Sequence, residues 1–192
     1  MSYTNKEIKK GIKLHLIDTK KFKTNLIVAV LTLPLNRETV TKNSLIPAVL
    51  KRGTKNLNSQ DEISKKLEEM YGAEFDCGIE KIGDNHVIKF YLEALNGNYI
   101  PKENEKNIEK TAIDLLLDII FNPLTQDGQF KEEYVEAEKK NIEILINSKI
   151  DNKASYALNR CIEEMYKDKP YGLYKYGYIE DLEAIKIQNI KV

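Results

Sequence analysis

The stretch Ser44–Asn56, SLIPAVLKRGTKN, is the part of the chain from which the fold can be worked out. Ser44 is of a residue type that caps helices, and it precedes an apolar run. Pro47 would then lie in the first turn, where its missing N–H costs little, and Gly53 would end the helix. The stretch therefore predicts a short helix that begins at Ser44 and ends before Gly53-Thr54.

The segments on either side of this helix have the patterns of β-strands. Residues 11–17 alternate apolar and polar side chains, and residues 25–35 form a run rich in β-branched residues. A turn at residues 18–21 would let these two strands pair antiparallel. After the helix, residues 73–95 have the pattern of strand, turn and strand, which predicts a hairpin.

Helical spacing dominates the rest of the chain. Ser59 and Glu62 have capping-box spacing, so a helix is expected from there to Gly72. A polar surface connection is expected at residues 96–104. Further helices are expected at residues 105–121, 130–150, 154–166 and 179–185. The order of elements predicts an α+β fold, a mostly antiparallel sheet with helices packed on one face.

Composition and charge narrow the function classes. Lysine and arginine total 30, aspartate and glutamate total 30, and the balance offers no argument for binding nucleic acid or an anionic membrane. No apolar run has the length of a membrane span, and the first residues lead into charge, so a cytoplasmic protein is expected. Cys77 and Cys161 lack metal-binding spacing and are expected to be reduced, packed thiols.

The order of several short segments resembles one peptidase family. After the strand pair, the helix that ends in Leu50–Asn56 is followed by the capped helix, by Tyr71–Phe75, by the hairpin through His86 and, late in the chain, by Pro170–Gly172. Each segment alone is unspecific, but their order and spacing, over most of the chain, resemble the amino-terminal domain of the pitrilysin/insulinase/mitochondrial processing peptidase family. The resemblance implies that this domain would normally continue with another helix and strand beyond residue 192.

The resemblance also implies where a zinc site would stand. In this family an inverted His-x-x-Glu-His motif lies on the helix that ends at the Gly-Thr pair, and a further glutamate comes from a later helix. Counting back from Gly53 places Ser44, Pro47 and Ala48 at the His, Glu and His positions, and Leu145 at the distal glutamate. None of the four residue types supplies a zinc ligand or a general base here. The expectation is a fold without catalytic residues, without zinc and without another cofactor.

A displaced metal site is the alternative. Glu138 and Glu143 lie close to Leu145 in the sequence, and together with His15 or His86, the two histidines of the chain, they could bind a displaced metal ion. An active peptidase or hydrolase with unrecognised catalytic residues is the other form of this alternative. No carboxylate or cysteine stands near either histidine at a ligand spacing, so both are better explained as surface or hydrogen-bonded strand residues.

Tyrosines gather near the C-terminal end of the sequence. They form either a candidate partner or peptide surface, because tyrosine is enriched at interfaces, or a loop packed on the helical layer, which is the favoured interpretation. The members of the candidate surface are Tyr171, Tyr174, Tyr176 and Tyr178.

The expected function follows from the resemblance. The chain is expected to be a non-catalytic peptidase homologue that binds unstructured peptides or protein segments, or forms part of a chamber wall, beside a homologous subunit with an intact zinc motif. An unpaired sheet edge and an exposed apolar face would also favour a homodimer.

Overall fold

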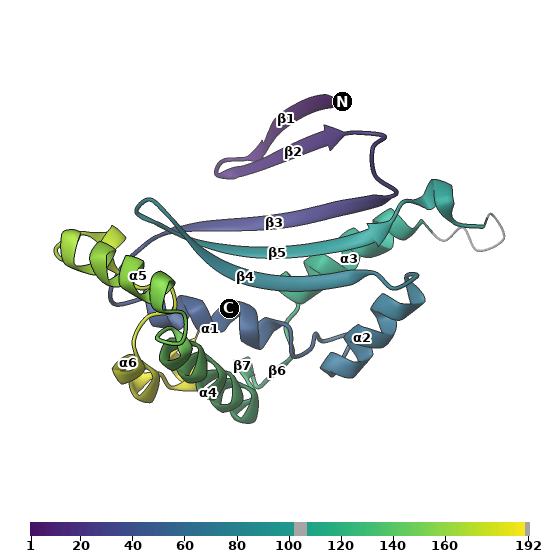
Figure 1. Cartoon of the computed structure of the whole chain (residues 1–192). Helices are drawn as coiled ribbons and strands as arrows, with labels where there is room; N and C mark the ends of the chain where they lie inside the picture. The colour runs from purple at the N-terminus through teal and green to yellow at the C-terminus, as the bar shows by residue number, and fades with distance from the viewer. Residues whose placement is uncertain (102–106, 191–192) are drawn as a thin grey trace.

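A three-stranded antiparallel sheet is the centre of the molecule, with strand order β3 (Thr24–Pro34), β5 (Asn85–Leu95) and β4 (Glu74–Ile82) (Figure 1). The computed structural model describes residues 1–101 and 107–190. The predicted hairpin is confirmed, since β4 and β5 pair antiparallel from Glu74↔Glu93 to Ile82↔Asn85. β3 pairs with β5 over its whole length, from Thr24↔Leu95 to Pro34↔Asn85.

Helices cover one face of this sheet, as expected. α1 (Val40–Leu50) and α3 (Ile108–Phe121) pack on β5, whose inward side chains alternate with outward ones along the strand. Ile88, Phe90 and Leu92 are between 0 and 2 % exposed and form the centre of the core. Because β5 is the middle strand and faces both helices, it is the most deeply buried element of the sheet.

The other elements lie around the edge of this helical layer. α2 (Gln60–Glu69) is capped by Ser59, whose Oγ accepts a hydrogen bond from the Glu62 N–H, as the capping box predicts. The remaining helices and short strands are β6 (Thr125–Gln126), β7 (Gln129–Phe130), α4 (Glu132–Ser148), α5 (Lys153–Met165) and α6 (Ile179–Ala184). Single 3-10 turns occur at Gly97–Tyr99, Pro170–Gly172 and Ile187–Asn189. The expected connection at 96–104 and the helix start at 105 fall partly outside the described residues.

The expected pairing of the first two strands is wrong. Residues 12–18 form β2 (Ile12–Asp18), which pairs with a strand that sequence reasoning missed, β1 (Ser2–Lys9). The tight turn between them is possible because Gly11 adopts a φ of +82°, a conformation that suits glycine. The two strands form a separate sheet on the side of β3 away from the helices (Figure 1), and every residue of both strands is exposed.

The start of the first helix is also corrected. The helix begins at Val40, after Thr39, so Ser44 is a buried interior residue and no N-cap. Thr39 is the N-cap, and Asn36 holds the turn before the helix: its side chain accepts the Glu38 N–H at 2.8 Å, and its carbonyl accepts the Val40 N–H at 2.9 Å. Pro47 therefore lies in the helix interior, not in its first turn.

The two cysteine side chains differ in how far they are exposed to solvent. Cys77 is partly buried as expected, but Cys161 is exposed on α5, because its side chain lies on the face of that helix away from the core. Within the described residues, no helix is long and apolar enough to cross a membrane.

Candidate functional site

A pocket of about 410 Å³ lies between α1, β4 and α4. Its wall contains all four positions that sequence reasoning connected with the metal site, namely Ser44, Pro47, Ala48 and Leu145. The first three lie on one side of α1 because residues three and four apart share a helix face, and Leu145 reaches the pocket from α4. The structure therefore brings together positions about a hundred residues apart in the sequence. Their origin as a former metal site stays a prediction.

The chemistry of these four side chains does not fit zinc. Alanine, proline and leucine carry no donor atom, and the Ser44 hydroxyl is 1 % exposed and already engaged. Its Oγ lies 2.7 Å from the Thr41 carbonyl oxygen and 3.1 Å from that of Tyr176, both of which are acceptors. Across residues 1–101 and 107–190, no cluster of three histidine, cysteine or acidic side chains could hold a metal ion.

The residues of the alternative metal site are far from forming one. Glu138 lines the pocket, but Arg52 donates to its Oε1 from Nε at 2.6 Å, and Asn141 donates to its Oε2 at 3.0 Å. Glu143 is exposed on α4, outside the pocket wall. His15 lies on the exposed hairpin, hydrogen-bonded to Tyr3, and His86 lies on β5. The structure does not bring these four together.

The Cys77 thiol also lines the pocket, and it is held in its unreactive form. It donates a hydrogen bond to the Pro47 carbonyl oxygen at 3.3 Å. Burial raises the pKa of Cys77 to about 11, a shift that the nearby Lys51 ammonium only partly opposes. Because the thiolate is the reactive species, Cys77 is inert near neutral pH.

The tyrosine-rich segment Tyr171–Tyr178, here called the strap, crosses the sheet beside the pocket. Its four tyrosines are half-buried, and Tyr176 lines the pocket. The Tyr174 and Tyr176 rings meet edge to face with centroids 5.8 Å apart. A basic side chain lies over each strap tyrosine: Lys81, Lys149, Lys175 and Arg37 over Tyr171, Tyr174, Tyr176 and Tyr178. Packing on the fold thus accounts for this cluster; a role as a partner surface stays a prediction.

The strap is fastened to the sheet by three polar side chains. Lys81 on β4 donates to the carbonyls of Tyr171 and Leu173 at 2.7 and 2.9 Å. Lys175 donates to the Ile79 carbonyl at 3.0 Å, and its own carbonyl lies 2.9 Å from His86 Nε2, which must be the donor. Burial lowers the pKa of both Lys81 and His86.

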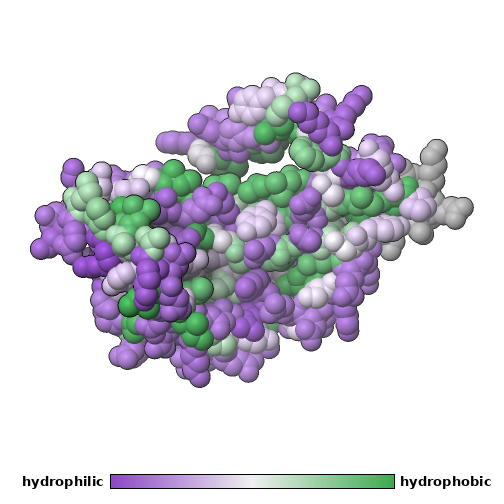
Figure 2. Space-filling model, viewed as in Figure 1, coloured by the Kyte–Doolittle hydropathy of each residue, from purple (hydrophilic) through white to green (hydrophobic). Residues whose placement is uncertain are grey.

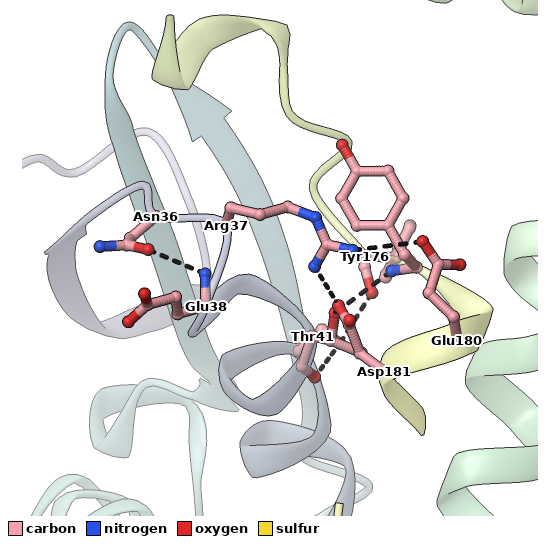
Figure 3. Close-up of polar contacts among 9 residues, drawn as sticks. Asn36, Arg37, Glu38, Thr41, Tyr176, Glu180 and Asp181 are labelled. Carbon is pink, nitrogen blue, oxygen red and sulfur yellow. Dashed lines mark hydrogen bonds and ion pairs between the residues drawn. The ribbon is translucent and has the colours of Figure 1, made fainter. Parts of the chain in front are cut away.

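A polar cluster fastens the other end of the strap to α1 (Figure 3). The Thr41 hydroxyl donates to Asp181 Oδ2 at 2.6 Å and accepts the Tyr178 N–H at 3.2 Å. Arg37 pairs with Asp181 and with Glu180, and its guanidinium stacks 4.0 Å from the centroid of the Tyr178 ring. The strap is thereby held at both ends, and Tyr176 is held at the pocket.

A smaller pocket of about 200 Å³ continues the first one along β4. It is lined by Phe75 and Asp76 of β4 and by one side of α2, whereas the larger pocket meets β4 at Cys77–Ile79. Lys51, the C-cap of α1, lines both pockets and lies between them. Sequence reasoning missed Lys51 and Lys81 as site residues, and it considered His86 only as a ligand of the alternative metal site, because nothing in their local pattern shows which strand or helix they will face.

Known proteins similar to this chain were found by sequence and by structure. No family model matches the chain. The chain is 35 % identical over 192 residues to a protein of Bacillus subtilis (strain 168) named "Probable inactive metalloprotease YmfF", and the match covers 99 % of this chain and 45 % of that protein. The chain thus spans less than half the length of this relative.

Solved structures share the fold. A conserved protein from Enterococcus faecalis V583 superposes with a TM-score of 0.88 at 28 % identity, over 98 % of this chain and 44 % of the other. The peptidase M16 inactive domain from Pseudomonas fluorescens follows with a TM-score of 0.71 at 15 % identity, over 99 % of this chain and 42 % of the other. Pitrilysin gives 0.62 at 16 % identity, over 94 % of this chain and 18 % of pitrilysin.

Fold and site together define an α+β metallopeptidase-type domain whose expected metal positions carry no metal ligands. In sequence the chain is similar to a relative named a probable inactive metalloprotease, and in fold it is similar to domains of M16 and pitrilysin-like peptidases.

Proposed function

We propose that this chain is a non-catalytic member of the family that binds extended peptide or protein segments without cleaving them. The observation that carries the proposal is the larger pocket, which has the size of a binding site while its described wall offers no metal donor set. Pockets of this size, mostly apolar with a few polar groups, are typical of ligand sites. Binding without cleavage is the function that this combination supports best.

The free edge of β4 supports the proposal that the ligand binds in an extended conformation. β4 is an outer strand of its sheet, and both pockets lie along it. The Cys77 N–H bonds to the Asp76 side chain and the Ile79 carbonyl to Lys175, so side chains rather than a neighbouring strand satisfy these two backbone groups. A peptide bound along β4 as an added strand would make these backbone hydrogen bonds in place of the side chains. Every second side chain of the peptide would then enter the pockets.

A zinc and cleavage measurement tests the absence of catalysis. Purified protein is expected to contain no stoichiometric zinc by elemental analysis and to leave unstructured peptides intact in the presence of added zinc. A peptidase activity that a chelator abolishes would refute the proposal. The same result would favour the alternative of an active peptidase or hydrolase with an unrecognised site.

A pocket-filling variant tests the binding site. Ala48→Phe would place an aromatic ring in the larger pocket and is expected to weaken binding of labelled unstructured peptides at least tenfold, because the ring excludes the ligand's side chain. Leu158→Phe, on the exposed surface of α5, is the matched control and should leave binding unchanged. Equal binding by both variants would mean that peptides bind outside the larger pocket.

We further propose that the chain pairs with a homologous subunit that carries an intact zinc motif, or with a second copy of itself. The support is an apolar surface on the side of the sheet away from the helices, where Figure 2 shows apolar side chains on the sheet and on the hairpin above it. Leu26, Val28 and Val30 of β3 are 63, 45 and 54 % exposed. A two-stranded hairpin is marginal on its own, which favours a partner that covers it.

Light scattering of the chain alone, and after mixing with a homologue that has the zinc motif, tests this pairing. Val28→Asp is expected to prevent the larger species, whereas the exposed Thr24→Asp at the end of β3 should have little effect. A monomer under all conditions would refute pairing but would leave the peptide-binding proposal intact.

A further inference from the structure

The charged side chains in the wall of the larger pocket do not balance one another. Its wall contains four side chains that can ionise, Lys51, Cys77, Glu138 and Tyr176. The Cys77 thiol stays protonated, and a tyrosine hydroxyl is neutral near pH 7. The Glu138 carboxylate is balanced by Arg52, whose Nη2 lies 2.5 Å from Oε1. The ammonium of Lys51 is therefore the one charge of the wall that lacks a counter-charge.

Lys51 is also free to meet a ligand. It is half-buried at the C-terminal end of α1, and no ion pair of Lys51 occurs within the part of the chain that the structure describes. In the wall of the smaller pocket, the acidic residue is Asp76, whose two oxygens already accept from the Cys77 N–H at 2.8 Å and from the Tyr91 hydroxyl at 3.2 Å. The lysine can thus offer its hydrogen bonds to a group that enters from outside.

We propose that Lys51 selects the bound segment: the site prefers an extended peptide in which a large apolar residue lies directly beside a carboxylate. The apolar side chain enters the larger pocket against Pro47, Ile142 and Leu145, and the carboxylate meets the Lys51 ammonium at the junction of the two pockets. The carboxylate belongs either to an aspartate or glutamate side chain or to the C-terminus of the peptide. This inference rests on the proposed peptide-binding function and adds the chemical class of the ligand.

Fluorescence anisotropy with matched peptides tests the inference. The first pair is labelled Ser-Val-Thr-Phe-Glu-Val-Ser-amide and its Phe-Gln counterpart, and the second is labelled Ser-Val-Thr-Phe with a free or an amidated C-terminus. The wild-type chain is expected to bind one carboxylate form about fivefold more tightly than its neutral partner at low salt, with the preference falling as salt rises. The pair that shows the preference identifies the source of the carboxylate.

Variants of the lysine separate charge from packing. Lys51→Met keeps the apolar stem and is expected to bind both members of each pair equally, and Lys51→Glu should prefer a peptide with lysine in place of glutamate. Lys65→Met, exposed on α2 and outside both pocket walls, is the control and should keep the preference of the wild type.

The outcomes distinguish the two proposals. Equal binding of charged and neutral peptides by the wild type, or a preference that survives in Lys51→Met, overturns the charge selection while peptide binding stands. No binding of any peptide by the wild type overturns the proposed function and the inference with it.

Discussion

The two halves of α1 differ in what they contact. In the amino-terminal half, Thr41 and Ser44 are buried and hydrogen-bonded to the strap and to the helix itself. In the carboxyl-terminal half, Pro47, Ala48 and Lys51 line open pockets. The amino-terminal half of α1 thus holds the strap in place, and the carboxyl-terminal half forms part of the walls of both pockets. The comparison shows that the contacts that position the pocket can be complete while the residues in its wall carry no metal ligands.

The largest expected effect comes from placing metal ligands at the four predicted positions in the wall of the larger pocket. Ser44→His, Pro47→Glu, Ala48→His and Leu145→Glu together would place two histidines one helical turn apart, a general base between them and a carboxylate facing them from α4. We expect the combined variant to bind one zinc ion with a dissociation constant of about 1 μM or below, which corresponds to about 8 kcal/mol. Isothermal titration calorimetry measures the constant.

A control places the same spacing outside the pocket. Lys42→His with Ile46→His puts two histidines four residues apart on α1 at positions that do not line the pocket, and should bind zinc far more weakly. Equal affinity of the two variants would show that the four pocket positions have no special geometry. The comparison between the two halves of α1 would then lose its basis in a former metal site.

The next effect concerns the fastened half of α1. Gly177 has a φ of +81°, and a Cβ built there would lie 2.6 Å from the Thr41 Cα. We expect Gly177→Ala to lower the free energy of unfolding by about 3–4 kcal/mol, because left-handed strain and a backbone clash add together. Urea denaturation followed by circular dichroism measures the change.

Gly83→Ala separates strain from crowding. Gly83 also has a positive φ, +55°, but no atom lies within 4 Å of its ideal Cβ, so only the conformational cost of about 1 kcal/mol is expected. A similar loss in both variants would mean that the strap does not fit tightly against Thr41.

Sequence reasoning found most elements because their signals are local. The Ser59 cap, the hairpin of β4 and β5 and the apolar stripe of α3 each depend on residues near one another in the chain. The metal positions also met around one pocket, because the count from Gly53 preserves the face of a helix even when the start of that helix is wrong.

The errors came from contacts that no local pattern contains. Ser44 is of a residue type that caps helices, but in the structure it lies inside α1 and is hydrogen-bonded to the carbonyl of Tyr176, 132 residues further along the chain. The pairing of β2 is a different case, because the turn at Gly11 that joins it to β1 is a local signal, and the prediction placed the turn at residues 18–21 instead. Tertiary packing alone decides which side chains, such as Lys51, face the pockets.

The smallest expected effect concerns the sheet side of the strap. His86 is fully buried on β5, its Nε2 donates to the Lys175 carbonyl, and its Nδ1 has no partner within residues 1–101 and 107–190. Burial holds the pKa of His86 below its ordinary value of 6.5, so the native state stays neutral while the unfolded chain takes up a proton as the pH falls below that value. The free energy of unfolding should therefore decrease by up to about 1.4 kcal/mol per pH unit below pH 6.5, until the pH passes the native pKa.

His86→Gln isolates this contribution, because glutamine can still donate to the Lys175 carbonyl but does not titrate. Urea denaturation of the wild type and the variant at pH 7 and at mildly acidic pH should show a smaller acid-induced loss of stability in the variant. His15→Gln, on the exposed hairpin, is the control for the loss of an imidazole and should keep the slope of the wild type. An unchanged slope in His86→Gln would contradict the prediction, because it would mean that burial does not lower the pKa of His86 in the native state.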